Sequence, residues 1–254
     1  MIADSGVADV RYLEQGKLGL SASRNLALAS ANGELLAVTD DDCAPDQGWV
    51  AGLIAAFQDA SQPVAVTGPI RAFEGVPPPG MYAISLREAE HARIFAVRAI
   101  PWMVGSGGNF AARVPDLRQI GGWDERLGVG TPGQAAEDCE LIDRIFLAGG
   151  TIYYTPDAVV RHAWQTRDRR KSTRWSYGFG IGALCGIRAA DRDTYAAKMV
   201  ASYAGLHLPA LARAAARLNW DQASERLAAL GALVPGCIYG FRVGARPNVS
   251  LTWE

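Results

Sequence analysis

The sequence predicts an α/β protein with a mostly parallel sheet flanked by helices and a helical appendage at the C-terminal end. Strand-like and helix-like segments alternate between residues 35 and 68, as in sheets built from strand–helix–strand units. The first strand-like run ends in three consecutive aspartates, Asp40, Asp41 and Asp42. From residue 195 onward, apolar residues recur at helical spacing among charged ones. We therefore expect one α/β domain over residues 1–175 and a helical region over residues 176–254.

The composition is that of an ordinary globular protein. The chain has 254 residues, 49% of them hydrophobic and 20% charged, which suffices for one large core with an appendage. Its formal net charge of -1 gives no reason to expect a nucleic-acid partner. Four widely spaced cysteines predict free thiols in a reducing compartment. No leader-like start or uncharged apolar window of spanning length is visible, so a cytoplasmic location is expected.

The individual elements follow from apolar periodicity and turn residues. Ser21 is a plausible N-cap for the first helix, which Asn32 and Gly33 would end. Cys43 to Asp46 should stop the strand before the aspartates and turn the chain. Helices are predicted over residues 21–31, 49–57, 82–97, 116–120 and 139–148, and strands over residues 35–39, 64–68, 109–112 and 151–154.

The three aspartates are the first candidate site. Adjacent carboxylates repel one another and contribute nothing to packing, whereas ligands of open α/β sheets bind at the carboxyl ends of strands. Mg²⁺ is usually held by one or two carboxylates together with substrate phosphates. The pattern therefore predicts a site for a metal and a diphosphate. The alternative is a solvated acidic turn in which Asp46 caps the following helix.

Three blocks of sequence carry a resemblance to a known family. The first comprises residues 18–27, Gly33-Glu34 and Thr39 to Asp42. The others comprise residues 105–110, 121–125 and 137–138, and residues 156–162. In this order and spacing they resemble family 2 glycosyltransferases. The resemblance implies a GT-A fold, a nucleotide-diphospho-sugar donor and a metal-binding Asp-any-Asp motif.

The resemblance also implies roles for individual residues. Asp42 would bind Mg²⁺ or Mn²⁺, and Asp40 would lie near the ribose. His162 would be a second metal ligand, since imidazole suits several divalent ions, although a surface imidazole is the alternative. The residues implied in donor binding are Arg24, Asn25, Asp40, Asp41, Gly107, Gly108, Asn109, Arg174 and Trp175.

Several of these residues have simpler explanations that the sequence leaves open. Arg24 and Asn25 could be an exposed arginine and a local cap. The glycine-dense loop before Asn109 allows backbone to approach a ligand closely, but it could be only a tight turn before a strand.

Glu137 and Asp138 are the candidate catalytic acids. In the resembled family the aspartate of this pair is the base of an inverting transfer, which carries over to Asp138, and Glu137 would orient the acceptor or the base. Such a base must reach the acceptor hydroxyl within hydrogen-bond distance. The alternative is that both acids only favour the N-terminus of a helix.

Residues 161–175 carry six Lys or Arg residues and one Asp. Arginine binds phosphate bidentately, so this stretch could clamp the donor diphosphate, or it could be a solvated loop. Lys171 to Trp175 resembles the Gln-any-any-Arg-Trp motif of processive family members, with Lys at the Gln position. That departure and the lack of spanning helices argue against a processive synthase.

The chain departs from the resembled family at its start, where members carry a strand–helix–strand unit for which there is no room before Arg11. We therefore expect an N-terminally incomplete catalytic domain. A truncated or degenerate member acting as a non-catalytic binding module is the alternative function. A nucleotidyltransferase is a third, but the glycine-rich basic loop that it would need near the N-terminus is not found.

The expected partners are a nucleotide-sugar donor and a glycan, lipid-linked or small-molecule acceptor, in biosynthesis of a cell-envelope polysaccharide or glycoconjugate. The basic-flanked amphipathic C-terminal helices can lie on the cytoplasmic face of a membrane as peripheral contacts. The alternative is that they pack on the catalytic domain.

Overall fold

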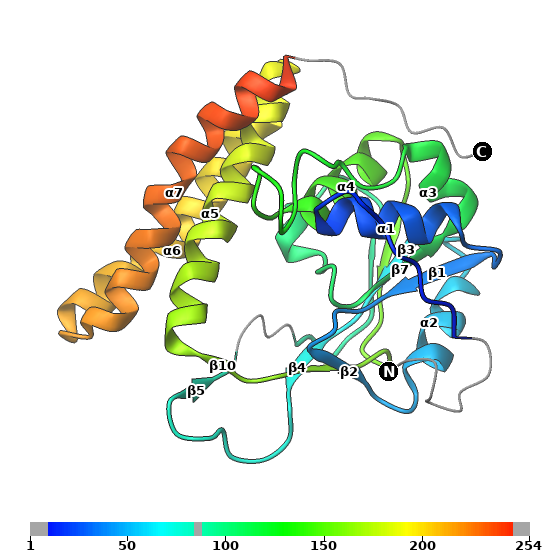
Figure 1. Cartoon of the computed structure of the whole chain (residues 1–254), viewed down its shortest axis with the longest axis horizontal. Helices are drawn as coiled ribbons and strands as arrows, with labels where there is room; N and C mark the ends of the chain where they lie inside the picture. Colours follow the sequence, from blue (N-terminus) through cyan, green and yellow to red (C-terminus); the bar gives the residue numbers. More distant parts are fainter. Residues whose placement is uncertain (1–9, 84–87, 246–254) are drawn as a thin grey trace.

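A five-stranded mixed sheet organises the chain in the computed structural model, which describes residues 10–83 and 88–245 (Figure 1). The strands, in spatial order, are β1 Leu35–Val38, β7 Phe110–Arg113, β3 Ala65–Thr67, β8 Ile152–Tyr154 and β6 Arg93–Phe95. β1, β3 and β8 run in one direction, and β7 and β6 run against them. The α/β class is confirmed, but the expected mostly parallel sheet is mixed, because β3 and β8 form the sole parallel pair of this described sheet.

The antiparallel strand β7 determines where the site forms. It pairs with β1 on one side and β3 on the other, and its first residue, Phe110, lies opposite Val38 and Thr67. The glycine loop that precedes Phe110 therefore emerges at the same edge as the aspartates that follow Val38. Two segments far apart in the sequence are brought together by this register.

Helices cover both faces of the sheet. The flanking helices are α1 Leu20–Ala29, α2 Trp49–Phe57, α3 Val114–Ile120 and α4 Glu137–Leu147, with a short 3₁₀ helix η1 at Pro101–Met103. Successive strand residues point to opposite faces. Thus Ala65 packs in the core with α1, α3 and α4, whereas Val66 packs against α2. These two apolar layers fix the sheet between the helices.

A second, three-stranded sheet corrects one prediction about the chain after the aspartates. Its strands are β2 Cys43–Pro45, β9 Val160–His162 and β4 Ile70–Ala72. Cys43 lies opposite His162 in the β2–β9 ladder, so the chain continues as a strand where a stop was expected. The Asp46 side chain accepts hydrogen bonds from Arg161 at 2.7 and 3.1 Å, and no side-chain cap of α2 is formed.

Two further predictions were wrong. The helix expected over residues 82–97 is replaced by β5 Met81–Tyr82 and β6, while residues 84–87 lie outside the described part of the chain. Pairing of β6 with β8 and burial of Phe95 override the local helical pattern. Ser21 is not the N-cap of α1, which is Gly19; instead the Ser21 hydroxyl donates to the Leu127 carbonyl.

Three long helices form the C-terminal part of the fold, which extends along one side of the sheet region (Figure 1). They are α5 Arg167–Ala190, α6 Tyr195–Ala216 and α7 Trp220–Gly244. The expected boundary between residues 175 and 176 falls inside α5. The basic stretch from Arg167 to Trp175 forms the first turns of this helix, so the alternative of a solvated loop is wrong there. The short strand β10 Gln165–Thr166 leads into it and pairs with β5.

Helices α5 and α7 touch through glycines. A Cβ atom at Gly178, Gly182 or Gly186 would collide with the α7 backbone at Ala229, Leu233 or Cys237, and one at Gly236 or Gly240 would collide with α5. Close backbone approach requires small residues at the contact, which explains the glycine-rich sequence of α5.

Helix α7 is apolar enough, and at 25 residues long enough, to cross a membrane by length and composition, with a mean hydropathy of 1.4 in its most apolar window. From the sequence we expected no uncharged apolar window of spanning length, whereas this helix is long and apolar enough when a few charged residues are allowed. In the described structure, 28% of that window is buried.

Candidate active site

A cavity of about 1160 Å³ lies between the sheet edge and the C-terminal helices. One side is formed by the aspartates after β1, the glycine loop before β7 and the N-terminus of α4. The other side is formed by residues of β10, α5 and α6. The cavity therefore joins the predicted donor and catalytic residues to a part of the chain that was expected to be an appendage.

Arg24 organises the acidic side of the cavity. Its guanidinium is 6% exposed and bonds the Asp40 and Glu137 carboxylates, each at 3.0 Å. It also donates to the Gly107 carbonyl over 3.4 Å. The alternative of an exposed arginine is therefore wrong. Arg24 joins β1, the glycine loop and α4 into one polar cluster.

Backbone hydrogen bonds hold the Asp138 carboxylate at the N-terminus of α4. The Gly107 N–H donates to Asp138 Oδ2 over 2.7 Å, and the Cys139 N–H donates to Oδ1 over the same distance. The carboxylate lines the cavity with its orientation set by the glycine loop. This geometry suits a base that must keep its acceptor lone pair aimed at a substrate hydroxyl.

The neighbouring acids are harder to ionise than free carboxylic acids. Burial raises the pKa of Glu137, and the Asp138 charge adds to this effect while Arg24 opposes it. Burial also raises the pKa of Asp40, with Arg24 again opposing. A positive charge bound in the cavity would relieve this crowding of carboxylates.

Asp42, Cys43 and His162 are the candidate metal ligands. One ligand atom from each lies within 4.8 Å of the others, and His162 Nε2 is 3.5 Å from Asp42 Oδ1. His162 is buried, which rules out the surface imidazole alternative. Its Nδ1 lies 2.8 Å from the Ala163 carbonyl, and donation there directs the Nε2 lone pair toward Asp42.

A carboxylate and an imidazole fit Mn²⁺ or a similar divalent ion. Burial and the charges of Asp40 and Asp42 raise the pKa of the Cys43 thiol to about 11, so it stays protonated and is a poor ligand. Arg169 Nη2 lies 3.5 Å from Asp42 Oδ2 and places a cation at this edge of the cavity.

The predicted glycine loop is both a tight turn and a wall of the cavity. A Cβ atom at Gly107 would lie 2.8 Å from Arg24 Nη1, and one at Gly108 would lie 2.9 Å from Asp40 Oδ2. Glycine is therefore needed here for side chains of the site to approach the backbone. Both glycines line the cavity, as does the exposed Asp41.

Three predicted donor-binding residues do not line the cavity. Asn25 is buried and exchanges hydrogen bonds with the Trp123 backbone at 2.8 and 2.9 Å. Asn109 donates to the Pro69 and Ala158 carbonyls, which ties the strand to neighbouring loops. Trp175 is 44% exposed and is not among the cavity-lining residues. The geometry gives the two asparagines structural roles.

The cavity lining includes four residues that sequence reasoning missed. Gln165 lines the cavity, is 7% exposed, and its Oε1 has no hydrogen-bond partner among the described residues. Trp102, Tyr203 and His207 also line the cavity. No local motif marks them, because an amphipathic stripe has the same spacing whether it packs in a core or faces a cavity.

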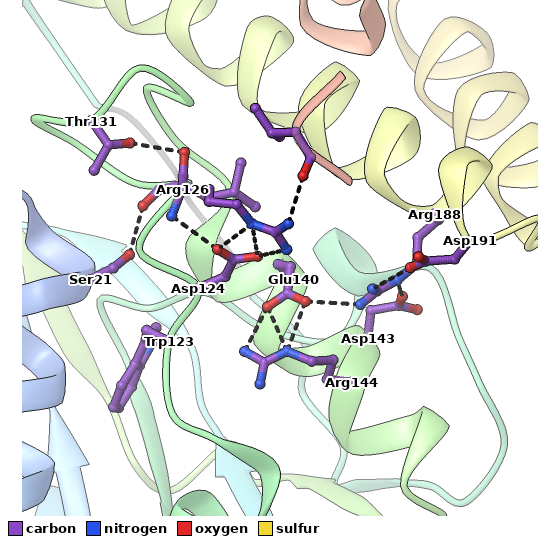
Figure 2. Close-up of polar contacts among 12 residues, drawn as sticks. Ser21, Trp123, Asp124, Arg126, Thr131, Glu140, Asp143, Arg144, Arg188 and Asp191 are labelled. Atoms are coloured by element: carbon purple, nitrogen blue, oxygen red, sulfur yellow. Dashed lines mark hydrogen bonds and ion pairs between the residues drawn. The ribbon is translucent and has the colours of Figure 1, made fainter. Parts of the chain in front are cut away.

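A buried ion-pair network attaches helix α4 to α5 (Figure 2). Glu140 accepts from Arg144 at 2.8 Å and from Arg188 at 3.0 Å, and Asp143 accepts from Arg188 at 2.6 Å. Burial opposes ionisation of Glu140, but the two arginines hold its pKa below the usual value. The network thereby holds α4, whose second residue is Asp138, against α5.

Parts of the chain are similar to known proteins. Residues 2–121 match the family model described as glycosyl transferase family 2. The "Pre-mycofactocin glycosyltransferase" of Mycobacterium tuberculosis is 28% identical over 181 residues, covering 68% of this chain and 36% of that protein. The "Probable glycosyltransferase YdaM" of Bacillus subtilis is 26% identical, covering 63% of this chain and 38% of YdaM.

Two further likenesses extend the comparison. The "Succinoglycan biosynthesis protein ExoM" of Rhizobium meliloti is 27% identical, covering 66% of this chain and 51% of ExoM. A crystal structure of GalNAc-T7 with UDP, GalNAc and Mn²⁺ aligns with a TM-score of 0.42 and 20% identity, covering 58% of this chain and 31% of that one. The chain spans about a third to a half of the length of these curated relatives.

Over these matched segments the chain is similar to glycosyltransferases. The match to family 2 covers residues 2–121, which include the first of the three motif blocks. The mixed sheet with flanking helices fits the GT-A-like α/β fold expected from the resemblance.

Proposed function

We propose that this chain transfers a sugar from a nucleotide-diphospho-sugar donor to an acceptor hydroxyl, with a divalent metal and with inversion at the anomeric carbon. The observation that carries the proposal is the meeting of two groups in one cavity. The Asp42–His162 pair can hold a metal, and the oriented Asp138 carboxylate can act as a base.

The donor would occupy the side of the cavity nearest Asp42. Mn²⁺ or Mg²⁺ held by Asp42 and His162 would neutralise charge on the leaving diphosphate when bound. Arg169, beside Asp42, is positioned to bind the same oxygens. Asp40, Asp41, Gly107 and Gly108 border this side and would position the nucleotide and its sugar.

Asp138 would remove the proton from the acceptor hydroxyl as its oxygen attacks the anomeric carbon. The new glycosidic bond forms while the bond to the diphosphate breaks, so a single displacement inverts the configuration. The Gly107 and Cys139 N–H groups hold the carboxylate for this transfer. The ion pair between Arg24 and Glu137 stabilises that arrangement.

The acceptor and the cellular setting are proposals of the same kind. We propose a glycan, lipid-linked or small-molecule acceptor in envelope polysaccharide or glycoconjugate biosynthesis, which the likeness to the succinoglycan biosynthesis protein ExoM supports. A cytoplasmic location, with the apolar helix α7 in peripheral contact with the membrane, is consistent with that role.

The test is donor binding by the purified chain. Thermal unfolding would be followed with Mn²⁺ and UDP-, GDP- and dTDP-sugars, for the wild type, Asp42→Asn and the exposed-loop control Asp157→Asn. A donor at about 100 times its dissociation constant should add about 2.7 kcal/mol of stability. We expect a metal-dependent shift in the wild type and the control, lost in Asp42→Asn.

Absence of any nucleotide-dependent shift in the wild type would overturn the proposal. Metal-dependent donor binding without sugar transfer to any hydroxyl acceptor, including water, would instead support a non-catalytic binding module.

A further inference from the structure

The two walls of the cavity carry opposite charge. The sheet side presents the carboxylates of Asp40, Asp42 and Asp138, whereas the helical side presents the cations Arg169 and Arg174. These two arginines lie more than one helical turn apart on α5, and Arg169 is the one beside Asp42. Arg174 therefore needs a separate explanation.

Arg174 lies in a cluster with an excess of positive charge. The neighbouring charges that act on its pKa most strongly are those of Arg226, Arg170 and Glu225. Glu225 is already bonded by Arg170 at 3.1 Å. Within the described part of the chain, the Arg174 guanidinium has no hydrogen bond or ion pair of its own. Three guanidinium groups thus share one carboxylate at the cavity wall, and burial together with Arg226 and Arg170 lowers the pKa of Arg174.

Three aromatic rings line the same cavity as Arg174 and Asp138. Tyr203 and His207 have ring centroids 4.4 Å apart, and Trp102 meets the Tyr203 ring edge-on at 5.8 Å. All three line the cavity with Asp138. Burial and the two nearby arginines, Arg226 and Arg174, lower the pKa of His207 to about 4, so its imidazole adds no charge at neutral pH.

We propose that the acceptor carries an anionic oxygen group, a carboxylate or a phosphate, which Arg174 binds while Trp102 and Tyr203 support the part of the acceptor that reaches Asp138. This assignment rests on the proposed transferase function. In this assignment Arg174 binds the acceptor and Arg169 binds the donor diphosphate. The sequence had suggested instead that the whole basic stretch binds the diphosphate. An anion bound at Arg174 would supply the negative charge that the three guanidinium groups lack.

The experiment uses the full chain saturated with Mn²⁺ and the unglycosylated nucleoside diphosphate, so that added anions cannot occupy the donor site. The probes are glycerol 3-phosphate and glycerate, with glycerol as the uncharged reference. Dissociation constants would be measured by calorimetry for the wild type, Arg174→Gln, Arg169→Gln and the exposed control Arg213→Gln of α6.

We expect at least one anionic probe to bind the wild type and the Arg213→Gln control, and glycerol to bind neither. Arg174→Gln should weaken anion binding about 10- to 100-fold, as for loss of a charged hydrogen bond, without weakening the nucleotide. Arg169→Gln should weaken nucleotide binding without weakening anion binding. Because Arg174 has surplus positive neighbours, its replacement should not lower the melting temperature of the free protein. Arg174→Lys, which keeps the charge but not the bidentate geometry, should fall between wild type and Arg174→Gln.

Two results would overturn the inference. One is nucleotide binding that is intact in the wild type with no anion binding. The other is loss of nucleotide binding in Arg174→Gln with anion binding unchanged. Failure of the wild type to bind the nucleotide would instead count against the proposed function. A second arm compares phosphatidylcholine vesicles with and without a polyprenyl phosphate: binding that requires this lipid and Arg174 identifies a lipid-linked source, and binding of the soluble probes alone identifies a free acid.

Discussion

At the scale of single residues, the backbone contacts of Asp138 distinguish it from an ordinary acid at a helix start. Both of its carboxylate oxygens accept backbone hydrogen bonds, one of them from a loop distant in sequence. An acid that only stabilised the α4 N-terminus would need no contact with Gly107. The shared geometry supports a base whose position depends on the glycine loop.

Asp138→Asn should therefore retain the fold and donor binding but lose transfer. Asparagine has the same shape, but its amide nitrogen cannot accept one of the two backbone hydrogen bonds and its side chain cannot take up the hydroxyl proton, so turnover should fall about 10²- to 10⁴-fold. Steady-state transfer rates, measured beside nucleotide affinity, check this outcome. An unchanged rate in Asp138→Asn would assign the base elsewhere.

The pKa of Glu137 makes stability depend on pH. Burial first, and then the charge of Asp138, raise this pKa from 4.5 to about 7, so the folded chain binds the Glu137 proton more tightly than the unfolded chain does. The wild type should lose stability relative to Glu137→Gln as pH rises from 4.5 to 7, because ionising the buried acid favours unfolding. A pKa difference of one between the folded and unfolded chains corresponds to about 1.4 kcal/mol. Urea unfolding of both proteins across this interval measures the effect, which a constant gap in stability would contradict.

The residues that sequence reasoning could find are those with an unusual local pattern. Three aspartates after an apolar strand and a Glu-Asp pair before a helix stand out along the chain. The structure brings both sets to one cavity. Gln165 and His207 have no such neighbours in sequence, and their place in the wall depends on how β10 and α6 pack. A sequence pattern cannot report that packing.

At the scale of elements, the contact between α5 and α7 depends on small residues. Glycine costs stability inside a helix, since it loses more backbone freedom on folding than alanine does. The cost at Gly182 is offset by the close approach of the Leu233 backbone of α7. Gly231, also within α7, has nothing within 4 Å of the place where a Cβ would stand, so no such contact compensates it.

Gly182→Ala and Gly231→Ala should thus have opposite effects. The first forces two helices apart and should destabilise the fold by about 1–3 kcal/mol. The second should stabilise it by about 0.5–1 kcal/mol through helix propensity. Chemical denaturation of both variants provides the measurement, and equal effects in the two would show that helix contact is not the cause.

Elements were easiest to predict where one apolar face or a glycine stop sets them. The helix α2 begins and ends where its periodicity indicated, and α3 ends at Gly121 with φ of 95°, in the left-handed conformation expected of a glycine cap. The strands β2 and β6 were missed because two of the three residues in each are exposed, so no buried apolar run marks them. Pairing with distant partners decides the conformation of such short segments.

At the scale of the whole molecule, α5 belongs to the cavity and to the helical region at once. Its first turns carry Arg169 and Arg174, and its later turns pack on α7 and bond α4 through Arg188. The α/β class could be predicted because alternating strands and helices are local features. That the C-terminal helices complete the site could not, because it depends on contacts between segments remote in sequence.

The outer face of α7 leads to a prediction for the intact chain. Leu227, Val234, Ile238 and Phe241 are each 49–64% exposed and recur at helical spacing. Apolar faces of this kind, flanked by arginines such as Arg242, bind anionic membrane surfaces. We expect the chain to co-sediment with anionic vesicles, and the double variant Val234→Glu/Ile238→Glu to lose this binding while keeping its melting temperature. Wild-type protein that stays in the supernatant would contradict the peripheral contact.

The meeting of Asp42 and His162 has a consequence for folding as well as for chemistry. An ion held by both would cross-link residues 42 and 162, closing a large loop that contains most of the central sheet. Such a clip restricts the unfolded chain more than the folded one, as a disulfide does. Metal content would then govern how long the β2–β9 ladder stays closed, and a chelator should speed hydrogen exchange of its amides before any loss of the core.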